Sequence, residues 1–223
     1  MKRQDFPHLE DLMANFPSAE TLLTKPAVDW LILNKLDGGK EIVLEVQPVT
    51  PRPNTLEKMK EAAEAFPPVP RDASEEDKQK HLQRREQLNK LSIFLPDDKT
   101  NTEYFLDYRS IDRIYYHEDK LLHWVKEYGK EGRFREAFDL LFKLKRRVPD
   151  WPGTEDQHDN LIHIEAFYNL EKGNAETAFA WLIELYERNP KYPDLSLDFD
   201  KVIDALVNES IQQEEYRRAP AII

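Results

Sequence analysis

The 223-residue chain is long enough for one large or two modest domains, and 40% hydrophobic with 34% charged residues suits a helix-rich globular protein. The net charge of −11 is spread along the chain, and an evenly acidic surface repels phosphate backbones, so nucleic acid is not an expected partner. The absence of cysteine excludes disulfides, thiolate chemistry and Cys-ligated metals.

The start of the chain, MKRQDFPHLEDLM, has no apolar run of signal-peptide length, and no later stretch is apolar enough to span a bilayer. We therefore expect a soluble chain without membrane insertion. The compartment stays open: the chain is either cytoplasmic or a fragment of an exported protein.

Two short helices are expected first. The apolar residues of the first follow helical spacing on one face: Leu9, Leu12, Met13 and Phe16. Pro17 ends this helix, and the second spans 18–24, with Ser18 as its N-cap.

The period then changes to that of strands. Residues 29–34 and 41–49 form compact apolar or β-branched runs, and Asp37-Gly38 between them is a strong turn signal. This pattern predicts a β-hairpin. Pro48 lacks a backbone donor, which places the second strand at a sheet edge.

A helix is expected at 55–66, where Asn54 and Glu57 have capping-box spacing. The proline- and acid-rich stretch near 67–75 is typical of an extended, mobile linker. Residues 75–89 are so highly charged that we expect a solvated helix.

Two further strands are expected at 91–95 and 103–108, so that four strands close one small antiparallel sheet. From Ser110 onward the pattern is helical. One long helix ending at Gly129 or Gly132 is indicated by its apolar residues: Ile111, Ile114, Tyr115, Leu121, Leu122, Val125 and Tyr128.

The stretch 132–149, GRFREAFDLLFKLKRRVP, recurs forty-one residues later as 173–190, GNAETAFAWLIELYERNP. The matched positions are Gly132 and Gly173, Ala137 and Ala178, Phe138 and Phe179, Leu141 and Leu182, Leu144 and Leu185, Arg147 and Arg188, Pro149 and Pro190. Repetition at such a period predicts a helical array in which each unit buries its apolar face against the next.

The spacing Gly132, Phe134, Ala137 and Pro149 resembles the second half of a tetratricopeptide repeat. Gly opens the turn between two antiparallel helices, Ala lets their backbones approach, and Pro stops the second helix. A third copy is marked by Tyr216 and Ala219, again forty-one residues on, and the chain stops inside it. This pattern indicates either truncation from a longer protein, which we favour, or a short final cap.

The resemblance covers roughly half of the chain, and the unit here is longer than the family's. The family's small first-helix residue maps onto Val125, Ala166 and Val207, of which one is small. The expected fold is α+β: a small α+β domain at 1–108 with an antiparallel sheet, followed at 109–223 by about two and a half tetratricopeptide-like helix pairs.

The resemblance also implies a ligand groove on the first helix of each pair. The positions that it assigns are Leu122, Lys126, Lys130, His163, Phe167, Glu171, Asp204, Asn208 and Gln212. This set does not reproduce the Lys/Asn/Arg clamp that some members use for a peptide's C-terminal carboxylate, and its mixed charge argues against one strongly charged ligand.

Three groups of histidines or acids lack the spacing that a metal site needs. His117 and His123, and likewise His158 and His163, lack the one-turn spacing that two ligands of one metal need on a helix. The acids at 194–209 lack the glycine that a calcium loop requires. We expect no catalytic residues, no metal and no cofactor.

The leading hypothesis is a non-enzymatic interaction module that binds proteins or peptides in the groove or along a sheet edge, with homo-oligomerisation through an exposed terminal repeat as a further option. The alternative is an N-terminal accessory domain of a larger bacterial solute-binding or envelope protein. It rests on a similarity of WLIL, VLEV, LPDD and RSIDRIYYHED to helical-repeat segments of bacterial peptide-transporter binding proteins. An enzyme with an unrecognised site is the third possibility.

Overall fold

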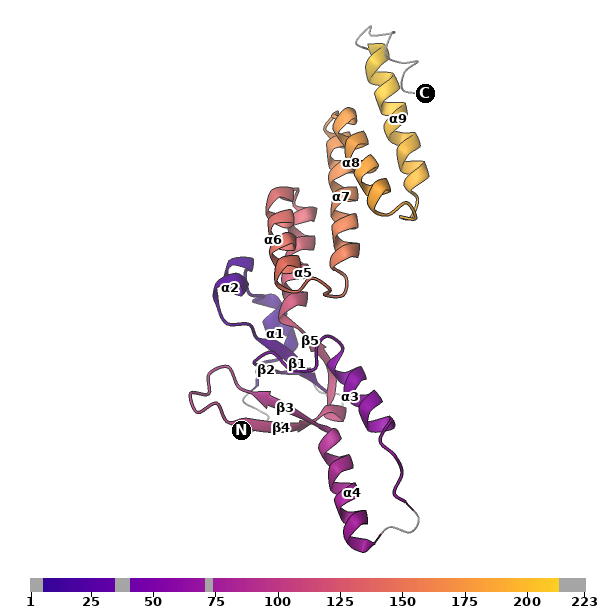
Figure 1. Cartoon of the computed structure of the whole chain (residues 1–223). Helices are drawn as coiled ribbons and strands as arrows, with labels where there is room; N and C mark the ends of the chain where they lie inside the picture. Colours follow the sequence, from indigo (N-terminus) through magenta and orange to yellow (C-terminus); the bar gives the residue numbers. More distant parts are fainter. Residues whose placement is uncertain (1–5, 35–40, 71–73, 213–223) are drawn as a thin grey trace. The chain divides into compact units, whose positions relative to one another are not determined.

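The computed structural model describes residues 6–34, 41–70 and 74–212 (Figure 1). It has the predicted α+β composition. Its internal contacts divide the chain into two compact units, Met1–Lys120 and Leu121–Ile223, which we call the N-terminal and C-terminal units. In the described residues no helix is long and apolar enough to cross a membrane.

The N-terminal unit combines short helices with five strands in its described part. In chain order its elements are α1 (Leu9–Ala14), α2 (Ala19–Thr24), β1 (Asp29–Leu33), β2 (Ile42–Val46), α3 (Thr55–Glu64), α4 (Glu75–Leu88), β3 (Lys90–Phe94), β4 (Glu103–Asp107), a 3₁₀ turn (Tyr108–Ser110) and β5 (Ile111–Tyr115).

The prediction of one four-stranded sheet is wrong, because the strands form two sheets. One has the order β2-β1-β5 and is antiparallel throughout, and the other pairs β3 with β4. The hairpin of β1 and β2 and the edge position of β2 agree with the prediction. The expected turn at Asp37-Gly38, part of the linker near 67–75, and Tyr216 and Ala219 of the third repeat copy lie outside the described residues.

The predicted helix start near Ile111 is also wrong, because Ile111–Tyr115 is strand β5. Ile114 lies opposite Leu31 of β1, and Tyr115 lies opposite Trp30. β-branched residues suit a pleated surface, and a partner strand outweighs the local helical period here.

A small apolar core joins α1 to the first sheet. Trp30, Ile32 and Val43 are its buried members. Leu9 and Leu12 of α1 and Phe16 after it pack against them, whereas Met13, the fourth residue of the predicted stripe, is 44% exposed. The ring of Phe16 meets Trp30 edge-on, with centroids 5.6 Å apart. The stripe therefore has the function of covering one face of the sheet, as amphipathic helices do.

Helix starts in this unit follow the predictions in part. Ser18 caps α2 by accepting a hydrogen bond from the backbone N–H of Thr21. Asn54, however, has a left-handed backbone (φ 60°) and makes no side-chain cap hydrogen bond, so the predicted capping box is wrong. α4 buries none of its residues, in agreement with its charge.

The C-terminal unit is helical in its described part. α5 (His117–Lys130) begins in the N-terminal unit and continues into this one. It is followed by α6 (Phe134–Arg147), α7 (Thr154–Glu171), α8 (Ala175–Arg188) and α9 (Leu195–Gln212). α7 packs against α6 and α8, and α8 packs against α9.

The forty-one-residue period extends to the backbone hydrogen bonds. Arg133 N–H donates to the Tyr128 carbonyl at 2.8 Å, and forty-one residues on Asn174 N–H donates to the Asn169 carbonyl at 2.9 Å. Helix bounds shift by the same number from α6 to α8 and from α7 to α9. Ala137 and Ala178 are both fully buried. The two repeats therefore share one local structure.

Gly132 and Gly173 provide a matched test of the turn that opens the second helix of each repeat. Both are left-handed, with φ of +73° and +77°, so alanine at either position is expected to cost about 1–2 kcal/mol. A Cβ on Gly132 would also lie 3.0 Å from Tyr168, whereas nothing lies within 4 Å of one on Gly173. Urea unfolding should show a lower free energy of unfolding for both G132A and G173A, with the larger decrease for G132A. No decrease for G173A would contradict the shared turn.

Candidate functional site

The nine predicted groove positions lie on α5, α7 and α9, three on each, and we call the side of these helices that carries them the groove face. The positions on successive helices are forty-one residues apart, and we describe them as three rows. The first row contains Leu122, His163 and Asp204.

The first row is largely used for contacts within the unit. A Cβ built on Gly153, in the turn before α7, would lie 3.9 Å from Leu122, so that side chain reaches the turn that opens the next repeat. His163 makes the equivalent contact, with its ring 5.2 Å from the ring of Tyr192 before α9. Asp204, in the last described helix, is exposed. Leu122 and His163 are therefore half-buried and contact the turn that follows their own helix pair.

A polar cluster joins α7 to α9 beside this row. His163 Nε2 lies 2.8 Å from a carboxylate oxygen of Asp198, which is buried, and Lys201 donates to the other oxygen at 2.9 Å. The Lys201 ammonium also lies 5.3 Å from the centre of the Phe167 ring. Lys201 thus lies over one face of the Phe167 ring, which is half-buried.

The remaining rows are open to solvent. Lys126, Lys130, Glu171 and Asn208 are exposed, and Lys130 donates to Glu127 at 2.6 Å. The side chain of Gln212 lies outside the described residues. The face thus carries cations on α5, an apolar ring on α7 and an acid on α9 at Asp204, as a mixed surface rather than a single charged patch.

The histidines and acids weighed as metal ligands have other neighbours. His158 lies edge-on to the rings of Phe138 and Phe142, with centroids 5.8 and 5.4 Å away. Burial and the nearby Arg188 and Lys145 lower the pKa of His158 to about 4. Within the described ranges, no three His, Asp or Glu side chains are grouped so as to hold a metal ion.

Glu165 of α7 is an acid that the sequence analysis did not single out. Burial, and secondarily the charge of Glu184 on α8, raise the pKa of Glu165 to about 7. One of its carboxyl oxygens is enclosed and has no hydrogen-bond partner among the described atoms. The hairpin of α7 and α8 therefore contains a carboxyl group that gains its charge near neutral pH.

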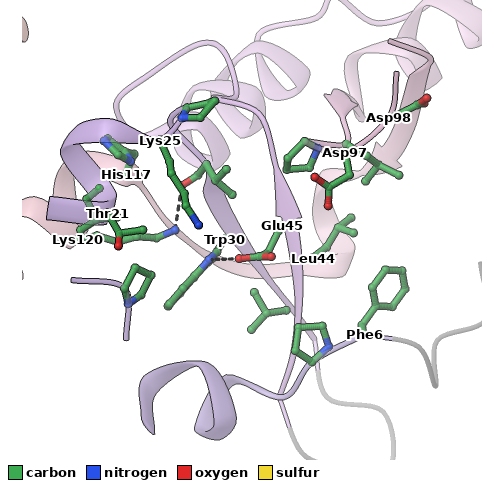
Figure 2. Close-up of a pocket in the computed structure, with 18 residues that line it drawn as sticks. Phe6, Thr21, Lys25, Trp30, Leu44, Glu45, Asp97, Asp98, His117 and Lys120 are labelled. Carbon is green, nitrogen blue, oxygen red and sulfur yellow. Dashed lines mark hydrogen bonds between the residues drawn. The ribbon is translucent and has the colours of Figure 1, made fainter. Parts of the chain in front are cut away.

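A cavity of roughly 750 Å³ lies in the N-terminal unit, beside the first sheet, and was not predicted (Figure 2). Its walls are mainly apolar, and Trp30, Glu45 and Lys120 form part of them. Trp30 Nε1 donates to Glu45 at 2.9 Å. Asp98 points away from the cavity, toward Thr100 and Thr102 of its own loop.

Lys120 is 1% exposed and lies in the wall of this cavity. Its ammonium donates to the Val28 carbonyl at 2.9 Å and lies 3.9 Å from the centre of the Trp30 ring. Burial lowers the pKa of Lys120 to about 8, against the opposing charges of Glu45 and Asp29. The ammonium group of Lys120 is therefore buried among protein atoms, and its charged form is less favoured there than in water.

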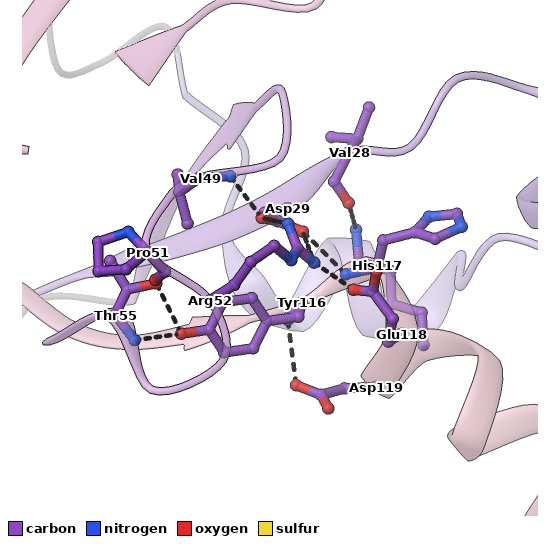
Figure 3. A network of polar contacts seen from close by, with 11 residues as sticks. Val28, Asp29, Val49, Pro51, Arg52, Thr55, Tyr116, His117, Glu118 and Asp119 are labelled. Carbon is purple, nitrogen blue, oxygen red and sulfur yellow. Dashed lines mark hydrogen bonds and ion pairs between the residues drawn. The ribbon is translucent and has the colours of Figure 1, made fainter. Parts of the chain in front are cut away.

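A second polar network surrounds Asp29, at the start of β1 (Figure 3). The Asp29 carboxylate is fully buried and accepts hydrogen bonds from the backbone N–H groups of Val49 and His117, each at 2.9 Å. Arg52 donates to both of its oxygens, at 2.7 and 3.3 Å, and also pairs with Glu118. One carboxylate thus ties β1, the segment after β2 and the start of α5 together.

The same segment is fixed by Thr55 and Tyr116. Thr55 N–H donates to the Tyr116 hydroxyl at 2.8 Å, that hydroxyl donates to Thr55 Oγ1 at 2.9 Å, and Thr55 Oγ1 donates to the Pro51 carbonyl at 2.6 Å. The Arg52 guanidinium lies 5.1 Å from the centre of the Tyr116 ring. These contacts join the segment after β2 to the start of α3 and to the residue before α5.

No protein-family model, curated protein or solved structure matches the chain. Function must therefore be argued from the chain's own geometry.

Two signals could have pointed to the buried polar groups. Asp29 directly precedes the apolar run WLIL, and a charge there enters the sheet together with the run. Lys120 falls among the apolar positions of α5, one residue before Leu121 and one turn after Tyr116. Sequence reasoning could notice both positions but could not supply their partners.

Proposed function

We propose that the C-terminal unit is a tetratricopeptide-like module that binds peptide segments of other proteins on its groove face. The observation that supports this most directly is the repetition of helix bounds, glycine turns and buried alanines at a spacing of forty-one residues. Stacked helix pairs of this kind present extended concave surfaces, which suit an unfolded peptide or a single helix.

The chemistry of the face specifies the peptide further. Phe167 provides an apolar contact in the middle row, between Lys126 on α5 and Asn208 on α9. Because cations lie on α5 and Asp204 lies on α9, a peptide with an apolar residue between an acidic and a basic end fits one direction better than the other. The charge pattern therefore selects orientation, and the ring supplies much of the affinity.

The test is a peptide-display selection on the full chain, with binding of the enriched peptides measured by fluorescence anisotropy. Phe167→Asp should weaken these peptides at least tenfold, because a charge replaces the apolar contact. The control is Phe142→Asp on α6, which is 47% exposed and outside the groove face. Circular dichroism checks that both variants remain folded.

Lys126→Glu is a second variant that avoids the half-buried ring. It should weaken peptides with an acidic end and spare those without one. Equal losses with Phe167→Asp and Phe142→Asp, or a selection that enriches no peptide, would contradict the proposal.

A further inference from the structure

Among the residues that the structure describes, no strand pairs with the outer edge of β4, and the hydrogen bonds of β3 and β4 define which backbone groups face that edge. Tyr108 N–H donates to the Asn89 carbonyl at 2.9 Å, next to the aligned pair Lys90 and Asp107. In an antiparallel ladder, hydrogen-bonded and non-bonded pairs alternate. Tyr104 and Leu106 therefore direct their backbone groups toward β3.

The backbone groups of Glu103, Phe105 and Asp107 consequently face away from β3. β3 confirms this alternation on its own far side, where the Phe94 carbonyl accepts from Gln47 N–H at 2.8 Å. In the described part of the chain, no backbone–backbone hydrogen bond joins the outer edge of β4 to another segment, and at its end the Asp107 carbonyl accepts from the Ser110 hydroxyl at 2.7 Å. Such an edge is a template for one more strand.

The side chains of this edge differ on its two faces. Tyr104 lies opposite Ile93, which is buried, so that face is covered in part by the protein's own core. Phe105 is on the other face and is 62% exposed, the largest exposure among the large hydrophobic residues of the described chain. Glu103 and Asp107 lie two residues to either side of Phe105 and share its face.

Charge decides between a second copy and another partner. If two copies paired their β4 strands antiparallel about Phe105, Glu103 of each would lie opposite Asp107 of the other, and like charges directly opposite destabilise a pair. Arg109 hydrogen-bonds Asp107 and lowers the pKa of that carboxyl, so the group stays ionised at neutral pH. Glu103 accepts only from the uncharged Ser92 hydroxyl, at 2.5 Å, among the contacts described. The edge therefore disfavours a second copy and favours basic residues, most strongly opposite Glu103, because Arg109 and the aligned Lys90 already offset the charge of Asp107.

We propose that β4 binds an extended peptide of another protein as an added antiparallel strand, with the pattern basic–x–apolar–x–basic. The apolar residue lies opposite Phe105 and exchanges both backbone hydrogen bonds with it. The two basic residues lie opposite Glu103 and Asp107 on the same face. This surface is separate from the groove face and is independent of the function proposed for the C-terminal unit.

The probe is a capped peptide with the core Lys-Thr-Phe-Thr-Lys, titrated into the full chain at low salt. We expect it to bind at least tenfold more tightly than the charge-reversed Glu-Thr-Phe-Thr-Glu, and to lose affinity as salt rises. The protein variant Phe105→Thr keeps strand propensity but removes the ring, and should weaken the basic peptide at least fivefold. Glu103→Lys with Asp107→Lys should invert the preference between the two peptides.

Two measurements separate strand addition from nonspecific charge attraction. Hydrogen exchange should show slowed amides at Glu103, Phe105 and Asp107 when the basic peptide is present. A peptide N-methylated at its Phe keeps the charge but loses a donor, so it should bind at least tenfold more weakly. Equal binding of the N-methylated peptide, or no slowing at Phe105, would overturn the proposal. Protection of Phe105 without peptide that disappears on dilution would overturn it in favour of a second copy.

Discussion

Replacing Asp29 with alanine is expected to lower the free energy of unfolding by about 3–5 kcal/mol, because it breaks a buried ion pair and leaves its partners unpaired. Asp29 is fully buried, and Arg52, Val49 N–H and His117 N–H all donate to it. The pair with Glu118 holds only part of the Arg52 guanidinium. Asp29→Asn keeps the shape of the side chain and one of its two acceptor oxygens. The decrease in the free energy of unfolding should therefore be smaller than that for Asp29→Ala.

Asp112→Ala is the matched control, because Asp112 pairs with Arg113 at 2.9 Å while both side chains are about half exposed. An exposed pair of this kind contributes about 1 kcal/mol or less. Urea unfolding followed by tryptophan fluorescence, to which the buried Trp30 contributes, measures both variants. A loss for Asp29→Ala no larger than that for Asp112→Ala would show that the network does not join its three segments.

Lys120→Met is expected to change how stability depends on alkaline pH. The pKa of Lys120 falls from 10.5 to about 8 on folding, so between these values the unfolded chain holds a proton that the folded chain has released. Stability contributed by this group therefore rises with pH across that window, by about 3 kcal/mol in total. From pH 8 to pH 10.5, the free energy of unfolding of the native chain should therefore rise relative to that of the Met variant.

The comparison is made as a difference between variants at each pH. Burial raises the pKa of Tyr115 to about 12, so this group weakens the fold as pH rises above 10, but it is present in both chains and cancels. Lys126→Met, at an exposed position of the same helix, should show no such slope. A constant difference between native chain and Lys120→Met from pH 7 to pH 10.5 would contradict the buried ammonium.

Local signals predicted local structure in this chain. The Ser18 cap, the charged helix α4 and the repeat of Ala137 at Ala178 all depend on residues close in sequence or on a strict spacing. The period identified turn positions and buried positions in both repeats, because each repeat uses the same short-range hydrogen bonds. Predictions of this kind need no knowledge of the rest of the fold.

Long-range pairing could not be obtained in the same way. The 111–115 stretch has apolar residues at helical spacing, but β1, some eighty residues earlier, takes it as a third strand. Asp29 and His117 are 88 residues apart, and Lys120 and Val28 are 92 apart. A single sequence does not indicate which of several distant segments a residue will contact. The order of the strands and the partners of the buried Asp29 and Lys120 are therefore known only from the structure.

The candidate groove stays a prediction, and the structure adds the contacts that its residues make. The resemblance placed nine residues on the first helices of the repeats, and the period puts them in rows. It gave no indication that Leu122 and His163 are half-buried by the turn that follows, because this depends on how far one repeat reaches toward the next. The groove, its ligand and the membership in a tetratricopeptide-like class stay proposals.

The contacts of the first row imply that the order of the repeats is fixed by the contacts between them. We call each such contact, of Leu122 or of His163 with the turn that follows, a joint. In the first joint, Leu122 lies beside the turn at Gly153. In the second, His163 contacts the ring of Tyr192 and the buried carboxylate of Asp198. Such joints are not interchangeable, so a chain with its repeats shuffled would bring mismatched surfaces together. Under a pulling force, the contacts of His163 with Tyr192 and Asp198 should therefore break at a different load from the contact of Leu122 with the turn at Gly153.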